Sequence, residues 1–404
     1  MLVNRYRWVI LILAYLCLLG VAFTLQSVPP ILTLIIKELE LTHAEAGLLM
    51  SLYALPGIFL SILAGLLSDR WGPFRAGVIS LIIVIIGVLI FAVSGAFIYA
   101  SLGRIITGVG GATMSIVNAQ IISQWFRGRE IGTAMGIYHT GMPVGTIICF
   151  TTFGRLGESL SWRMPIFITV MIGVVALGTF LILYKPAPDL QQRTTFDKEE
   201  KVTGLFSSLM KVGVLMWLIG FCWMWFNAAI ISFATFAPDF FVSKGYSIGF
   251  AGFLASLLMW GSLCLNPIIG RLVDRIGNND LIIGMGGLIL ATAIYLITIS
   301  TNFLFSMVVM AVAVAFVPTP VFSFPSKILK PENLGLGFGI ISTVGRVGML
   351  FGPYMTGLVR DKTGSYEVSF ILLSLLGILI TLTAFIIRIK GRKGANTVSQ
   401  NVRD

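Results

Sequence analysis

One apolar phrase occurs twice in this chain, once in each half. Residues 46–72 read AGLLMSLYALPGIFLSILAGLLSDRWG, and residues 251–277 read AGFLASLLMWGSLCLNPIIGRLVDRIG. Both copies end in the pattern Gly-x-x-x-Asp-Arg-x-Gly, and their offset of 205 is about half of the 404-residue length. Repetition at half the chain length indicates that the protein is built from two copies of one helical unit.

The composition places these units in a membrane. Apolar residues make up 57% of the chain, charged residues make up 11%, and the mean hydropathy is +0.95. Stretches of about 20 apolar residues are long enough to cross a bilayer as helices. We therefore expect an all-α membrane protein with twelve spans, at 7–36, 46–67, 75–96, 98–124, 131–154, 163–184, 212–241, 247–272, 281–300, 302–326, 335–358 and 366–387.

The basic residues predict the orientation of the spans. With the N-terminus inside, 20 of the 28 Lys and Arg residues fall in cytoplasmic segments, six in outer loops and two within spans. An excess of cations on the cytoplasmic side is typical of membrane proteins. We expect a protein of the cell membrane with both termini in the cytoplasm. The net charge of +11 is then a topology signal, and no nucleic-acid partner is expected, because the cations form no single face.

The polar segment at the middle of the chain divides it into parts. Residues 185–211 are polar and charged, and they separate two groups of six spans. The expected organisation is an N-terminal six-helix bundle at 1–184, a cytoplasmic linker at 185–211, a C-terminal six-helix bundle at 212–390 and a cytoplasmic tail at 391–404. A linker of this length allows the two bundles to move relative to each other.

Several motifs resemble those of the major facilitator superfamily, and the resemblance covers the whole chain. The first copy of the loop motif consists of Gly65, Asp69, Arg70, Gly72 and Arg75. The second copy keeps Gly270, Asp274, Arg275 and Gly277. The fourth span carries the pattern Arg104, Gly108 and Gly110. The fifth span carries GIYHTGMPVG, which departs from the family's Gly-Pro-x-x-Gly element because Met142 separates Gly141 from Pro143.

The resemblance implies two bundles that work by alternating access, and it gives the loop motifs a role as a conformational latch. Asp69 and Asp274 lie at the inner ends of their spans, where a helix C-terminus favours cations over anions. An acid at this position needs a partner, which a loop arginine or a neighbouring helix N-terminus can supply. The alternative is that both acids are simply solvated at the surface.

Glycines are concentrated in the fifth and eleventh predicted spans. Small residues let helices approach closely in lipid, where apolar packing alone gives little association energy. Pro143 and Pro353 are expected to bend the same spans. The residues that we expect to act in packing or as hinges are Gly136, Gly141, Pro143, Gly145, Gly348, Gly352 and Pro353.

Arg346 is the main candidate for binding a substrate. It lies near the middle of the eleventh predicted span, roughly 20 Å from either end at about 1.5 Å per residue. A cation at this depth costs several kcal/mol unless it faces a cavity or has a partner. All 17 acidic residues fall in loops or at span ends, so a bound anion is one candidate partner. Helix carbonyls, hydroxyls or water are the alternative.

Uncharged polar side chains within the spans complete the candidate site. They are Gln26, Asn118, Gln120, Asn227 and Asn266. Asn227 stands in the aromatic segment FCWMWFNAA, in which Trp223 and Trp225 are candidates to wall a pocket. Arg104 and His139 are assigned to proton coupling or to structure, and packing is the alternative for each of these residues.

These features favour a gradient-driven transporter of a small organic or inorganic anion. A proton-coupled multidrug exporter of the same fold is the alternative, although it would normally carry an acid within the membrane. We expect no enzyme activity, no cofactor and no metal site, because one histidine at depth makes no catalytic cluster. The expected partners are the substrate, a proton or counter-ion, and the lipid bilayer, and the protein is expected to be a monomer.

Overall fold

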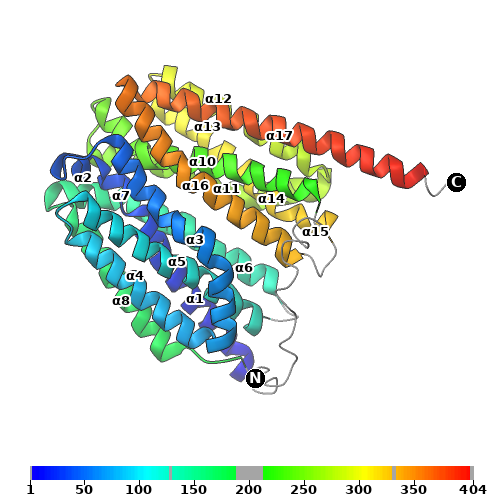
Figure 1. Ribbon diagram of the computed structural model, residues 1–404, viewed down its shortest axis with the longest axis horizontal. Helices are drawn as coiled ribbons and strands as arrows, with labels where there is room; N and C mark the ends of the chain where they lie inside the picture. Colours follow the sequence, from blue (N-terminus) through cyan, green and yellow to red (C-terminus); the bar gives the residue numbers. More distant parts are fainter. Residues whose placement is uncertain (1, 127–129, 188–212, 330–333, 401–404) are drawn as a thin grey trace. The chain divides into compact units, whose positions relative to one another are not determined.

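A computed structural model describes residues 2–126, 130–187, 213–329 and 334–400 (Figure 1). Every regular element in these ranges is a helix. Contacts between Cα atoms divide the chain into two compact units, which are described separately below. The first unit holds Met1–Glu200 together with Thr235–Ser256, and the second holds Lys201–Ala234 and Leu257–Asp404.

The first unit contains the helices of the first sequence half. They are α1 (Leu2–Gln26), α2 (Leu32–Glu38), α3 (His43–Trp71), α4 (Pro73–Ala92), α5 (Phe97–Trp125), α6 (Ile131–His139), α7 (Gly141–Ser159) and α8 (Arg163–Leu183). A core cluster between α1, α4, α5 and α8 buries Leu13, Met114, Val117 and Phe180. α3 begins with a capping box, in which Thr42 and Glu45 satisfy each other's backbone N–H groups.

The second sequence half supplies the remaining helices. They are α10 (Val214–Ser243), α11 (Ile248–Ile276), α12 (Asn279–Ile299), α13 (Phe303–Phe316), α14 (Pro318–Ser323), α15 (Pro325–Ile328), α16 (Leu334–Thr363) and α17 (Tyr366–Gln400). α10 and α11 belong to both units, because the end of α10 and the start of α11 pack with the first unit. α17 continues beyond the predicted start of the tail at residue 391 and ends at Gln400 (Figure 1). Within the predicted linker at 185–211, residues 188–211 lie outside the described ranges.

Eleven segments in the described ranges are long and apolar enough to cross a membrane. The fifth predicted span is not among them, and it is divided into α6 and α7 at Thr140. Pro143 has no N–H to donate to the carbonyl of His139, so the helix ladder is interrupted at this point. The tenth predicted span is divided into α13, α14 and α15, and prolines begin the two later pieces.

Candidate functional site

Arg346 lies on α16 in the second unit, where α16 packs closely against α10. Its side chain is half-buried. A Cβ atom added to the preceding Gly345 would overlap the indole ring of Trp223, and one added to Gly348 would overlap the carbonyl oxygen of Met224. The backbone of α16 therefore touches α10 on both sides of Arg346. This contact line, from Gly345 to Gly352, is called the α10–α16 seam below.

Aromatic side chains gather at the α10–α16 seam. Trp223 stacks on Phe226, with ring centroids 5.2 Å apart, and meets Phe322 edge to face at 4.9 Å. Asn227 lies one turn further along α10, and its amide nitrogen donates a hydrogen bond to the Trp223 carbonyl oxygen at 2.7 Å. The two helices that pack at the seam thus carry a guanidinium on α16 and an indole and an amide on α10. This combination suits a small polar ligand with an anionic group.

Asn266 lies elsewhere in the second unit, on α11. Its amide nitrogen donates to the Ser262 hydroxyl at 2.9 Å, and its buried amide oxygen meets no hydrogen-bond partner in the part of the chain that the structure describes. Pro267 follows directly within the same helix.

The polar candidates of the first unit lie in different places. Gln26 is buried at the end of α1. Asn118 is fully buried, and neither atom of its amide reaches a partner at hydrogen-bonding geometry among the described residues, although the Tyr138 side chain is close enough to interact. Gln120 accepts a hydrogen bond from Ser68 at 2.5 Å. Gln120 and Ser68 line a cavity of about 740 Å³ beside the turn between α3 and α4. Asn118 is not among the residues that line this cavity.

Arg104 is enclosed by three helices of the first unit. Its side chain on α5 is only 2% exposed. The guanidinium donates hydrogen bonds to the carbonyl oxygen of Thr24 at 2.7 Å and to that of Leu49 at 3.0 Å. Its central carbon also lies 4.9 Å from the ring centroid of Tyr53. Arg104 therefore joins α5 to the ends of α1 and α3 through groups that the chain itself supplies.

His139 is the last residue of α6, at the break in the fifth predicted span. Its side chain is exposed, and its ring meets that of Tyr138 edge to face with centroids 5.1 Å apart. In the described structure it lies in no cluster of ionisable groups that could hold a metal ion.

The last glycine of each copy of the loop motif has a positive φ angle. Gly72 and Gly277 have φ angles of 82° and 72°, which L-residues with side chains rarely adopt. Of the motif side chains, Arg70, Arg75, Asp274 and Arg275 are exposed, and Gly270 is half-buried. Asp274 makes no ion pair with the other described residues, while the surroundings of Gly65 and the side chain of Asp69 lie outside the described part.

The predicted packing glycines differ in their surroundings. A Cβ atom on Gly145 would come within 2.6 Å of Ala22, and one on Gly352 within 2.7 Å of the Ala228 carbonyl oxygen. Gly141 is next to Leu18, whereas Gly136 faces open space. Pro143 lies at the break between α6 and α7, but α16 continues without interruption through Pro353.

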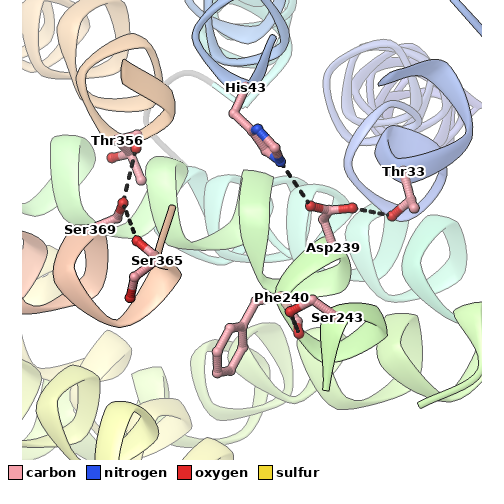
Figure 2. A network of polar contacts seen from close by, with 8 residues as sticks. All are labelled: Thr33, His43, Asp239, Phe240, Ser243, Thr356, Ser365 and Ser369. Carbon is pink, nitrogen blue, oxygen red and sulfur yellow. Dashed lines mark hydrogen bonds and ion pairs between the residues drawn. The ribbon is translucent and has the colours of Figure 1, made fainter. Parts of the chain in front are cut away.

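A polar cluster in the first unit was only partly visible in the sequence. Figure 2 shows the Asp239 carboxylate between His43 and Thr33. An acid near the end of the apolar run of α10 is the sequence signal for Asp239. His43 and Thr33 carry no such signal, because they lie about 200 residues away.

Figure 2 also shows a hydroxyl network of the second unit, in which Ser369 donates to the carbonyl oxygens of Thr356 and Ser365.

A duplicated set of long apolar helices with polar side chains at depth is the architecture of many membrane transporters. Comparison with known proteins identifies the family of transporters. The chain belongs to the Major Facilitator Superfamily, whose family model matches residues 11–250 and 232–402. This membership confirms the predicted family and the twelve-span, all-α fold.

Relatives with assigned names are transporters of small molecules. The human lysosomal dipeptide transporter MFSD1 is 24% identical, over 93% of this chain and 86% of its own length. The hexuronate transporter of Bacillus subtilis is 22% identical, over 90% of both chains. Among solved structures, a mutant form of the nucleoside transporter NupG matches with a TM-score of 0.78 and 17% identity, over 95% of this chain and 99% of that one.

Proposed function

We propose that the protein is a secondary transporter of a small organic or inorganic anion, and that Arg346 binds the charge of the substrate. The observation that carries this proposal is the position of Arg346, half-buried and central in a membrane-spanning helix that packs against α10, the helix of Trp223 and Asn227. A guanidinium at this depth is costly unless it serves binding or structure. Dipeptides and hexuronates, named for two relatives, both contain a carboxylate.

The remaining roles follow from this proposal. Transport would proceed by alternating access, driven by a gradient of protons or counter-ions, in a monomer with both termini in the cytoplasm. Gln26, Asn118, Gln120, Asn227 and Asn266 would supply hydrogen bonds to the substrate. The motif residues around Asp69 and Asp274 would form the latch. Arg104 would hold three helices together, and His139 would have a packing role at the helix break.

A ligand screen with purified protein tests the role of Arg346. A ligand at about 100 times its dissociation constant stabilises the folded state by roughly 2.7 kcal/mol. We expect one class of small carboxylates, sulfonates or phosphates to raise the unfolding temperature of the wild type. This shift should disappear in Arg346→Ala. The variant Lys362→Ala removes an exposed cation from the same helix and should keep the shift.

Cationic and neutral compounds in the same screen provide the opposing outcome. A shift with cationic drugs that persists in Arg346→Ala would favour the multidrug exporter and make Arg346 structural. A shift with nucleosides alone, unaffected by the substitution, would also contradict the anion proposal.

Asn118 offers an independent test of the polar lining in the first unit. We expect Asn118→Leu to keep or raise the unfolding temperature, because a buried amide without full hydrogen bonding lowers stability by about 1–3 kcal/mol. Uptake of the anion found in the screen should fall if the amide binds substrate. Reconstituted vesicles would measure uptake, with Thr113→Val, on the same helix, as a control. A clear loss of stability without a change in uptake would make Asn118 a packing residue.

A further inference from the structure

The turn between α10 and α11 makes close contacts with α7, within the first unit. A Cβ atom on Gly252 would overlap the carbonyl oxygen of Phe150, and one on Gly249 would come within 2.5 Å of the Arg155 side chain. On α7, a Cβ atom on Gly154 would lie 3.1 Å from the Ile248 carbonyl oxygen. The segment Thr235–Ser256 therefore lies directly on α7, although it belongs to the second sequence half.

A buried charge cluster lies within this contact. Asp239 on α10 is only 8% exposed. One carboxylate oxygen accepts a hydrogen bond from the Thr33 hydroxyl of α2 at 2.5 Å, and the other lies 3.7 Å from Nε2 of His43 on α3 (Figure 2). Burying a carboxylate is costly unless nearby donors or cations compensate for the lost water. Asp239 thus ties α10 to two helices of the first half.

His43 lies at the start of α3. His43 is the first residue of this 29-residue helix, directly after the capping residue Thr42. The positive end of the helix dipole favours an anion here and disfavours a protonated histidine. A proton on His43 is therefore most favourable when the Asp239 carboxylate lies opposite. The proton and the docked α10 segment stabilise each other.

Other charged groups surround this end of the unit, on each element that packs against the pair. They are Lys37 and Glu38 on α2, Glu40 after α2, Glu45 on α3, Arg155 and Glu158 on α7, Arg163 on α8, and Lys244 directly after α10. None of them is a histidine, and the chain contains only two histidines. Histidine is the side chain whose charge ordinarily changes between about pH 5 and pH 8. His43 is thus the group of this cluster suited to respond to protons in that range.

We propose that His43 and Asp239 form a proton-binding site, and that a proton bound there holds the α10–α11 turn closed against α2 and α3. The inference rests on the proposed alternating-access function, in which this turn must leave α2 and α3 when the transporter opens on this side. The proton comes from the solvent and resides on the imidazole, and the Asp239 carboxylate stays ionised. Its loss leaves a neutral imidazole, which no longer neutralises the carboxylate, so the closed turn is weakened as the pH rises.

Spin labels on the two sides of this contact provide the test. Ala96→Cys and Ser243→Cys place labels at exposed positions, and Cys264→Ser removes the exposed native thiol. Pulsed electron paramagnetic resonance then measures the distance between the labels in the full-length protein. We expect the population with the longer distance to grow about fivefold from about pH 5.5 to about pH 8, as the ion pair is lost.

Substitutions of His43 should act in opposite directions. His43→Gln has no positive charge, so the longer distance should dominate at both pH values. His43→Lys keeps a permanent charge, so the shorter distance should dominate at both. Asp239→Asn should resemble His43→Gln. If one variant fails to fold, the others still decide the question. The variants without the charge pair are expected to favour the longer distance, and His43→Lys is expected to favour the shorter one.

A second ion pair at the same end of the unit serves as the control. Glu38 on α2 pairs with Arg163 on α8 and involves no histidine. Glu38→Gln should leave the pH response of the label distance unchanged. A wild-type response that persists in His43→Gln would overturn the inference, as would a flat response in the wild type. The readout needs no substrate, so such a failure is separate from the anion screen with Arg346→Ala.

Discussion

Arg104→Ala is expected to lower the free energy of unfolding by about 3 kcal/mol or more, because hydrogen bonds to charged groups are each worth about 1.5–3 kcal/mol. The substitution removes the donors of two hydrogen bonds, to the carbonyl oxygens of Thr24 and Leu49, inside a fully enclosed site. It also leaves a cavity beside Tyr53. Thermal or denaturant unfolding of the purified protein in detergent measures the loss.

Two variants define what Arg104 does. Arg104→Lys keeps the charge, but it has no planar guanidinium to reach both carbonyls and cover the Tyr53 ring, so we expect an intermediate loss. Arg75→Ala removes an exposed arginine of the same unit and should change stability little. If Arg104→Ala unfolded like the wild type but lost uptake, the residue would instead contact the substrate, and the structural role proposed for it would be wrong.

The sequence was most informative where one local rule determines the structure. Apolar runs of bilayer length predicted the spans. The duplicated Gly-x-x-x-Asp-Arg-x-Gly pattern predicted two related halves, and its last glycine, Gly72 or Gly277, has a positive φ in both. The break at Pro143 also follows from a local cause, the missing N–H. At Pro353 the same residue type leaves α16 continuous, because a long packed helix can accommodate a proline by local adjustment of its hydrogen bonds.

Contacts between distant residues could not be predicted in this way. Asp239 was recognisable as an acid near a span end, but nothing in the chain around it points to His43 or Thr33. The same limit applies to the α10–α16 seam. Glycine spacing predicted close packing of the eleventh span without naming its partner, and only the structure shows Gly348 against Met224. Asn118 and Gln120 are two residues apart, yet they lie in different surroundings because successive helix positions face different directions.

Gly348→Ala is expected to destabilise the second unit by about 2 kcal/mol, the usual magnitude when a methyl group is forced into a packed interface. The added Cβ atom would overlap the carbonyl oxygen of Met224, and a backbone atom cannot turn away as a side chain can. α10 and α16 would have to separate beside Arg346 and Asn227. The thermal shift given by the anion should therefore shrink together with the unfolding temperature.

Gly339→Ala is the matched control, because the same change on the same helix is expected to have the opposite sign. A Cβ atom at Gly339 meets nothing within 4 Å. Replacing a helical glycine with alanine in open space stabilises a protein by about 0.4–1 kcal/mol, chiefly by restricting the unfolded chain. Helix propensity alone would give the two substitutions the same change in the free energy of unfolding. Changes of opposite sign would therefore show the effect of the close approach of α10 and α16 at Gly348. If Gly348→Ala were as stable as Gly339→Ala, the two helices would not be in contact at this point. The packing of the Arg346 helix against the helix of Trp223 and Asn227, on which the proposed anion site depends, would then be lost.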